Sequence, residues 1–229
     1  PTLLLIFWTI FDGDPNTLVT TDGKFLGISI NISFTVMMVA SIAFLGGIFL
    51  AIRFIHQRRM ITLITTVSTI SWKRLFQGFF TWFMFTAVIG FIESMLYPGR
   101  YVFTLDLRQF LVFSPLALIL IPIQTSTEEL FFRGYILQGF GLRIRNPIIL
   151  STISGLIFML PHLLNPEAEL NYLLMGAAYF AVGATLAYVT LQNNTLEIAL
   201  GMHAANNLFS ALFANAVITV MPTPSLFTV

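Results

Sequence analysis

Long uninterrupted apolar runs limit what this chain of 229 residues can fold into. They cover residues 26–52, 75–97 and 172–191, and each is long enough to cross a bilayer as a helix, which takes about 20 residues. Only 9% of the residues are charged, against about 25% in soluble domains. The sequence therefore predicts an all-α, polytopic transmembrane helical bundle of roughly six or seven spans. A membrane β-barrel is not expected, because its strands alternate apolar and polar residues.

Three further segments complete the predicted bundle. Residues 107–145 are too long for one straight crossing, and Pro115 and Pro122 are expected to bend them, because each proline removes a helical hydrogen bond. A span should reach about Gln124 and then continue or restart as a helix that carries an acidic pair. Two more spans are predicted at residues 147–164 and 195–220. The predicted organisation is N-terminal membrane helices and loops at 1–106, a core at 107–220 and a C-terminal tail at 221–229.

Basic residues predict the orientation of the bundle, because they are enriched in cytoplasmic loops. The side expected to face the cytoplasm, or an equivalent compartment, carries Arg53, Arg58, Arg59, Lys73, Arg74, Arg143 and Arg145. The other side carries Lys24, Arg100 and Arg108. Plasma, endomembrane and thylakoid membranes are not distinguished by this pattern. The net charge of +1 gives no reason to expect a nucleic-acid partner, and the absence of cysteine excludes disulfides and cysteine nucleophiles.

Glu128, Glu129 and Arg133 form a charged cluster between two apolar stretches. A charged side chain at membrane depth costs about 2.5–3.5 kcal/mol on insertion scales, so a functional site is the first hypothesis. Glu129 and Arg133 are four residues apart and are predicted to pair within one helix. Glu128 points about a hundred degrees away around that helix. We therefore expect Glu128 to lack this partner and to be free to face His162.

The same residues have a simpler explanation as helix caps. Thr125 and Ser126 each precede a glutamate by three residues, as in a capping box at a membrane interface. Arg133 would then extend to the interface along its aliphatic stem. Glu197, which follows Asn194 and Thr195, is expected to be an ordinary capping residue.

Two histidines and an asparagine lie in apolar segments. His203 and Asn207 are four residues apart and share a helix face, whereas His56 lies in a basic loop and is expected to be solvated. If the acid pair, His162, His203 and Asn207 meet in one bundle core, a carboxylate beside an imidazole can take a proton from water. Imidazole and amide N–H groups can hold an oxyanion, so these parts suffice to hydrolyse an amide. Each residue alone is also compatible with helix packing or interhelical hydrogen bonding.

The order of these residues resembles the CAAX protease and bacteriocin-processing (Abi) family, whose best-known members are the Rce1-type prenyl-protein endopeptidases. The three matching motifs are Glu128-Glu129-x-x-x-Arg133, Phe158-x-x-x-His162 and His203-x-x-x-Asn207. The resemblance covers about residues 107–220, which would be a CAAX protease-like core. It implies an intramembrane endopeptidase, a peptide hydrolase that acts on a membrane-tethered or prenylated protein or peptide.

The family resemblance also implies a role for each motif residue. Glu128 and His162 would activate the attacking water, and His203 and Asn207 would form the oxyanion site. The residues expected to support this geometry are Glu129, Arg133 and Phe158. One local departure is Pro161, which directly precedes His162 and is expected to kink its helix.

Other functions remain open at this level. Glu128, His162 and His203 match the ligand set of some catalytic zinc sites, although the family resemblance favours catalysis without a metal or other cofactor. A non-catalytic CAAX protease-like subunit or assembly factor of a larger membrane complex, for example a photosynthetic one, would also suit the low charge and apolar surface. A weaker alternative is a transporter or proton relay, for which the sequence shows no inverted repeat. Every one of these alternatives has membrane lipid as a partner.

Overall fold

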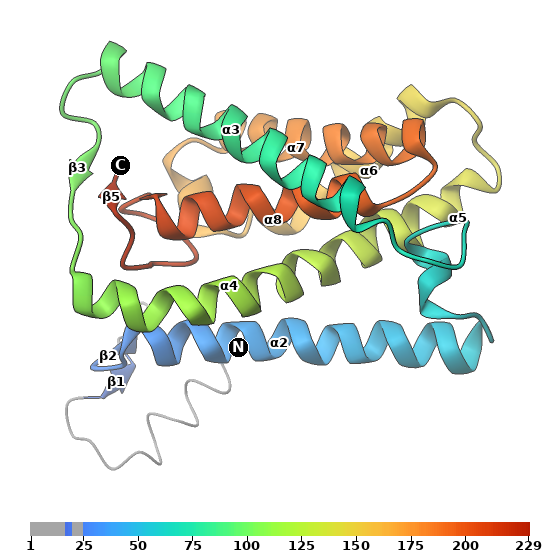
Figure 1. Cartoon of the computed structure of the whole chain (residues 1–229), viewed down its shortest axis with the longest axis horizontal. Coiled ribbons are helices and arrows are strands. Elements are labelled where there is room, and N and C mark those ends of the chain that lie inside the picture. Colours follow the sequence, from blue (N-terminus) through green and yellow to red (C-terminus); the bar gives the residue numbers. More distant parts are fainter. Residues whose placement is uncertain (1–16, 20–24) are drawn as a thin grey trace.

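The computed structural model describes residues 17–19 and 25–229, and it confirms the predicted all-α membrane bundle (Figure 1). The major described helices are α2 (Ile30–Leu50), α3 (Trp72–Leu96), α4 (Leu107–Glu129), α6 (Pro147–His162), α7 (Tyr172–Asn193) and α8 (Glu197–Leu212). Polar residues accept N–H hydrogen bonds at five of their N-termini, namely Ser29, Ser71, Asp106, Asn146 and Asn171. Polar caps therefore set where these apolar helices begin.

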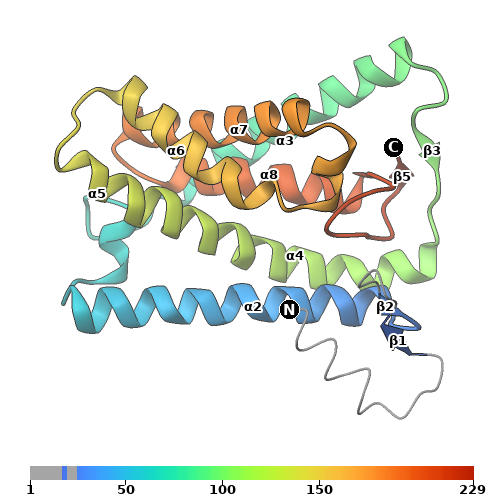
Figure 2. The same cartoon turned by 180° about the vertical axis from the view of Figure 1, so that it is seen from behind.

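Four of the described helical segments are long and apolar enough to cross a membrane. They are Ile30–Ile55, Trp72–Leu96, Leu107–Gly141 and Tyr172–Asn193, and α6 is a shorter apolar helix. The last helix, α8, is instead buried inside the bundle and packs against α3, α4 and α7. Figures 1 and 2 show α2 alongside α4 on one side, and α6 paired with α7 on the other.

Glycines allow the closest approaches between helices. A Cβ atom at Gly201 would lie 2.0 Å from the Leu75 carbonyl oxygen, and one at Gly78 would lie 2.2 Å from the Ile198 carbonyl oxygen. Only glycine therefore fits where α8 crosses α3. Gly183 on α7 is packed as closely, since a Cβ there would lie 2.9 Å from the Cβ of Phe158 on α6.

The helix that carries the acid pair continues without a restart. Pro115 and Pro122 both lie inside α4, and at Glu129 this helix passes directly into the π-helix η3 (Leu130–Leu137) and then into α5 (Gln138–Gly141). A second π-helix, η1 (Ala51–Ile55), extends α2. Segments of π-helix are rare in proteins, and those that occur often lie at functional sites. The change of helical period therefore falls at the acid pair and not at a proline.

The prediction of a final span over residues 195–220 is wrong. Helix α8 ends at Leu212, and the Asn215 side-chain amide then donates hydrogen bonds to the carbonyls of Ser210 and Met221. This amide satisfies backbone groups that a longer helix would have bonded internally. The chain then forms the small sheet β3-β5-β4, whose strands are Val102–Phe103, Phe227–Thr228 and Ala214–Asn215. Strand β5 is antiparallel to β3 and parallel to β4, whereas the separate pair β1 (Leu18–Val19) and β2 (Phe25–Leu26) is antiparallel.

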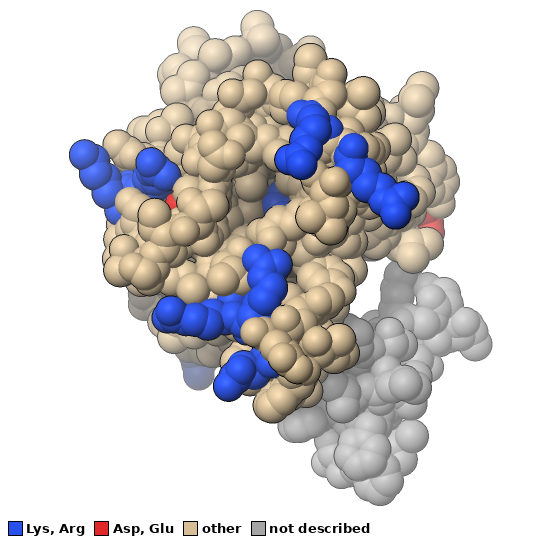
Figure 3. Space-filling view, turned by 90° about the vertical axis from the view of Figure 1, so that its right-hand side faces the viewer, with Lys and Arg blue, Asp and Glu red and all other residues tan. Residues whose placement is uncertain are grey.

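The ends of the bundle differ in charge. Figure 3 looks at the end where α2 finishes and α3 begins, and lysine and arginine side chains surround it. The sequence places Arg53 in η1, Lys73 in the first turn of α3 and Arg143 between α5 and α6. Arg100 lies at the opposite end, between α3 and α4, and Lys24 lies outside the described residues. We call the first end the basic end.

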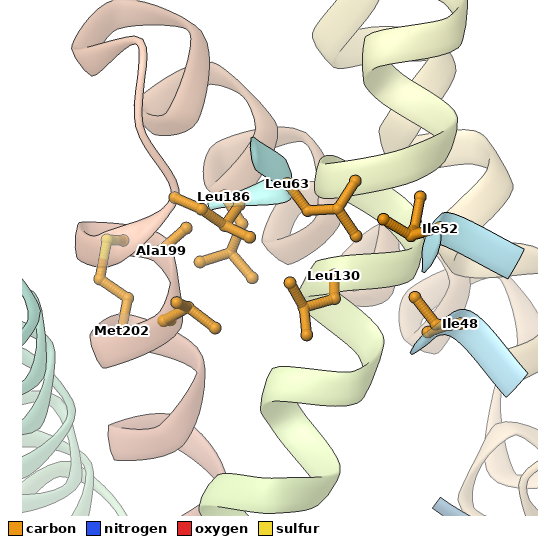
Figure 4. Close-up of a cluster of buried hydrophobic side chains, with 9 residues drawn as sticks. Ile48, Ile52, Leu63, Leu130, Leu186, Ala199 and Met202 are labelled. Atoms are coloured by element: carbon orange, nitrogen blue, oxygen red, sulfur yellow. The ribbon is translucent and has the colours of Figure 1, made fainter. Parts of the chain in front are cut away.

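An apolar cluster holds the basic end of the bundle together. Figure 4 shows its side chains meeting from α2, η1, the 3₁₀-helix η2 (Met60–Leu63), η3, α7 and α8. Its labelled members are Ile48, Ile52, Leu63, Leu130, Leu186, Ala199 and Met202. Leu130 is the first residue of η3, so this cluster fixes the helix immediately after the acid pair.

Candidate functional site

A cavity of about 870 Å³ lies between α2, α4, α6, α7 and α8. We call it the acidic cavity, because Glu128 lines it. Its polar lining includes Gln124, Glu128, His162, His203, Asn206 and Asn207, and its apolar lining includes Met37, Phe44, Phe131 and Phe158. The residues predicted to carry the chemistry thus line one cavity, although they come from three helices. Glu129 and Arg133 are not among its lining residues and lie buried behind it.

The predicted ion pair between Glu129 and Arg133 is confirmed. Arg133 Nη1 lies 2.6 Å from Glu129 Oε1, and both side chains are completely buried. Arg133 Nη2 donates a hydrogen bond of 2.9 Å to the Gly183 carbonyl, and its guanidinium lies 4.5 Å from the centre of the Phe158 ring. The expectation that Arg133 extends to the membrane interface is therefore wrong, because its charge is satisfied inside the bundle.

The same carboxylate oxygen that binds Arg133 also orients His203. His203 Nδ1 lies 2.7 Å from Glu129 Oε1. A carboxylate of a buried ion pair accepts hydrogen bonds, so Nδ1 carries a hydrogen. His203 Nε2 is then the nitrogen nearest Glu128, at 3.6 Å from its Oε2. This nitrogen accepts a proton when the ring is neutral and donates one when the ring is protonated.

Glu128 keeps one oxygen without a hydrogen bond. Its Oε1 accepts a hydrogen bond from the Gln124 side chain one turn earlier, whereas Oε2 has no hydrogen-bond partner among the described residues. The imidazole in direct contact with Glu128 is that of His203, whereas His162 lines the same cavity, so a role for His162 beside Glu128 stays a prediction. The contact with His203 is tertiary in origin: α8 packs against α4, and this brings His203 closest to the acid pair. With 23% of its side chain exposed, Glu128 is the accessible member of the pair.

His162 lines the same cavity from the end of α6. Its Nδ1 lies 2.7 Å from the Phe158 carbonyl oxygen, which can only accept, so Nδ1 donates and a neutral ring leaves Nε2 as an acceptor. The ring stacks on that of Phe158, with 4.2 Å between the ring centroids, and its centroid lies 4.9 Å from that of the Tyr179 ring. Pro161 does not end the helix, because α6 runs through it to His162.

Gln124 connects the acid to the amide and was not singled out from the sequence. It donates to Glu128 through Nε2, and its Oε1 accepts a hydrogen bond of 3.2 Å from Asn207 Nδ2. Asn206 then donates to Asn207 Oδ1, and Trp82 Nε1 donates to Asn206 Oδ1, both at 3.2 Å. A glutamine one turn before Glu128 in an apolar helix was the available signal.

The capping explanation of the acids is wrong. Both glutamates lie at the end of α4, where the helix continues into η3, and no helix begins there. The hydroxyls of Thr125 and Thr127 donate to the carbonyls four residues earlier, as threonines do within a helix. Glu197 is not an ordinary cap either: it is 1% exposed, and its Oε1 accepts from the Ser71 N–H at the start of α3. It therefore joins the first turn of α8 to α3.

The three residues of the alternative zinc site are not grouped as metal ligands in the described structure. Within residues 17–19 and 25–229, no group of three or more His, Asp or Glu side chains is placed to hold a metal ion. Glu128 and His203 are neighbours, but the Nδ1 of His162 is used by the Phe158 carbonyl. The expectation that the site works without a metal stays a prediction.

Fold and site together define a class of protein: a helical membrane protein with a carboxylate, two imidazoles and amides around one cavity. The family model described as "Type II CAAX prenyl endopeptidase Rce1-like" matches residues 107–209. This match contains all three motifs and confirms the resemblance to the CAAX protease family.

One relative from the curated proteins is similar over a longer stretch. The chain is 40% identical over 185 residues to a Bacillus subtilis (strain 168) protein with the name "Uncharacterized protein YyaK". The alignment covers 80% of this chain and 62% of that relative, so the chain spans about three fifths of the relative's length. No solved structure matches the chain.

Proposed function

We propose that the chain is an intramembrane endopeptidase of the CAAX protease (Abi) type, which hydrolyses a peptide bond in a membrane-associated or prenylated substrate. The observation that carries this proposal is that Glu128 lines the acidic cavity and has a buried Oε2 with no hydrogen-bond partner in the described part of the chain, 3.6 Å from His203 Nε2. A carboxylate oxygen with no protein partner can take a proton from a bound water. Glu128 would thus be the general base.

His162 is suited to assist that proton transfer. Its Nδ1 is committed to the Phe158 carbonyl, so Nε2 is the nitrogen available to water or to the leaving amine. Stacking on Phe158 fixes the plane of the ring. Glu128 and His162 lie on different helices around the same cavity, so a water between them could contact both.

His203 and Asn207 are the donors proposed for the oxyanion. His203 has its Nδ1–H on Glu129, so its Nε2 would donate to the oxyanion in the protonated form of the ring. Asn207 uses one amide hydrogen on Gln124 and has a second one available. Removing one such donor costs about 10²–10³ in kcat in a well-studied hydrolase. Glu129 and Arg133 would act through His203 and not on the substrate.

The shape of the acidic cavity supports a lipophilic substrate. Its volume of about 870 Å³ falls in the range of about 300–1,000 Å³ usual for ligand sites. The wall from α2 is apolar and includes Met37, Met38 and Phe44. Such a wall suits the apolar residues or the prenyl group of a membrane-tethered protein or peptide, which is the partner we propose alongside membrane lipid.

Comparing protein termini in native membranes tests the proposal. Cells carrying the wild type are compared with cells carrying Glu128→Gln at matched abundance. A matched control is Glu93→Gln, the same change at an acid that lies outside the cavity and pairs with Arg100 at 2.9 Å. Termini that vanish in Glu128→Gln and persist in Glu93→Gln would identify the substrate. Identical termini in all three, with a partner protein still bound, would instead favour the assembly-subunit function.

A chelator separates the metal-free reaction from the zinc alternative. Cleavage by purified protein in detergent is expected to continue after treatment with 1,10-phenanthroline and removal of the chelate. Loss of cleavage that added zinc restores would replace the metal-free mechanism by one in which Glu128, His162 and His203 bind the metal.

A further inference from the structure

A second cavity, of about 490 Å³, lies at the basic end and has a different chemistry. It is bounded by η2 and the loop after it, by η3 and α5, and by the junction of α7 and α8. Its lining contains two arginines, Arg58 and Arg133, and no acidic side chain. Polar neutral groups make up much of the rest, including Thr62, Thr66, Gln138, Thr190 and Thr195. We call it the arginine cavity, and Figure 3 shows the basic end hollowed between its blue side chains.

Arg133 presents an unused hydrogen-bond donor in this region. Its Nη1 binds Glu129 and its Nη2 binds the Gly183 carbonyl, but its Nε has no partner among the described residues. The residue is 1% exposed, so the Nε–H is not solvated as a surface group would be. An unpaired donor on a buried charged group is unfavourable, and Arg133 is one of the residues that line the arginine cavity.

Further positive charge surrounds the entrance. Arg58 is exposed where it lines the cavity, and the exposed Arg74 reaches Thr195, another lining residue, with 3.5 Å between Nη1 and Oγ1. Glu129 neutralises Arg133, but the carboxylate oxygen that binds Arg133 is also bonded to His203. Guanidinium groups bind the oxygens of phosphates and carboxylates with charge-assisted hydrogen bonds, and threonine hydroxyls add neutral donors. The lining is thus complementary to an oxyanion.

We propose that the arginine cavity binds a phosphate group, with the exposed Arg58 as its cationic contact and the buried charge of Arg133 behind its lining. The phosphate is either free inorganic phosphate or the headgroup phosphate of an anionic lipid. The site does not depend on the proposed peptidase activity, because it shares no lining residue with the acidic cavity. It is nevertheless connected to that cavity through the contacts Arg133–Glu129–His203, so occupancy would stabilise the arrangement of His203.

Thermal unfolding of the full chain in lipid nanodiscs tests this site. Inorganic phosphate is titrated into nanodiscs of phosphatidylcholine, with chloride at equal ionic strength as the reference for general screening. A second series uses nanodiscs that contain one fifth phosphatidylglycerol and no added phosphate. Stabilisation by inorganic phosphate identifies the free anion as ligand, and stabilisation by phosphatidylglycerol alone identifies the headgroup.

Variants separate the cavity from the general charge of the basic end. Arg58→Gln is expected to lower the affinity for the stabilising ligand about tenfold, as the loss of one charge-assisted contact does. Arg143→Gln removes an equal charge at the same end from a residue outside the cavity, and it should leave the affinity unchanged. Glu128→Gln should bind the phosphate ligand with the affinity of the wild type. Loss of the proposed peptidase activity can then be distinguished from loss of phosphate binding. No stabilisation in either series, or equal losses in Arg58→Gln and Arg143→Gln, would overturn the proposal.

Discussion

The two cavities of this protein differ in charge, although one buried ion pair connects them. The acidic cavity has the carboxylate of Glu128 beside imidazoles and amides, whereas the lining of the arginine cavity has guanidinium groups and hydroxyls. Glu129 binds His203 of the first cavity, and Arg133 lines the second. In the described part of the chain, Glu128 has no arginine or lysine partner, and His203 Nε2 lies 3.6 Å from its Oε2. We propose Glu128 for proton transfer and Glu129 for a structural role.

Glu128→Gln should have the largest effect and should affect only the acidic cavity. Losing a general base lowers a rate by about 10²–10⁴-fold. The amide is similar in size and keeps the contact with Gln124, so the melting temperature should stay close to that of the wild type. Cleavage of the substrate found in native membranes, together with a thermal unfolding curve, measures both. Full activity in this variant would refute the proposed role of Glu128.

Arg133→Leu should damage both cavities by destabilising the fold. It leaves the Glu129 carboxylate buried without its cation, and breaking a buried pair in this way costs about 3–5 kcal/mol. Unfolding by denaturant in detergent micelles measures the loss. The double variant Glu129→Gln/Arg133→Leu removes both charges and should recover part of it. If Arg133→Leu unfolds no more easily than Arg143→Leu at the exposed basic end, the ion pair does not stabilise the protein.

Gly183→Ala should disturb the contact of α7 with Phe158, at the residue whose carbonyl binds Arg133. The added methyl group would lie 2.9 Å from the Phe158 Cβ, and overpacking of this kind costs about 1–3 kcal/mol. It should lower both stability and cleavage, because His162 stacks on Phe158. Gly46→Ala is the control, since a Cβ there meets no atom within 4 Å. Equal melting temperatures for the two variants would show that α6 and α7 move apart at little cost.

Tyr179→Phe should have the smallest effect and should be confined to the acidic cavity. It removes the 2.7 Å hydrogen bond to Glu167 Oε1 but keeps the ring against His162. Such a bond contributes about 0.5–1.5 kcal/mol net. Cleavage should fall by less than tenfold, and phosphate binding should not change. A change in phosphate binding as large as that of Arg58→Gln would show that the two cavities are not separate.

Local sequence was sufficient for the parts of the site that lie within one helix. The ion pair of Glu129 and Arg133 follows from a spacing of four residues, because side chains at that spacing are neighbours on any α-helix. The partner of Glu128 could not be predicted in this way. The imidazole in direct contact with it is that of His203, since α8 packs against α4 and brings this side chain to the acid pair. Gln124 was missed although its contact with Glu128 has the same spacing of four residues, and only its link to Asn207 crosses between helices.

The sequence by itself determined that the chain forms apolar helices, that these helices build a membrane bundle, and that Glu129 binds Arg133. Hydropathy and helical spacing act over a few residues and need no knowledge of the fold. Only the tertiary structure decided where α8 ends, which imidazole meets Glu128 and that a second cavity lies at the basic end. These features depend on how closely helices approach one another, and glycines such as Gly78 and Gly201 allow distances that no local pattern specifies.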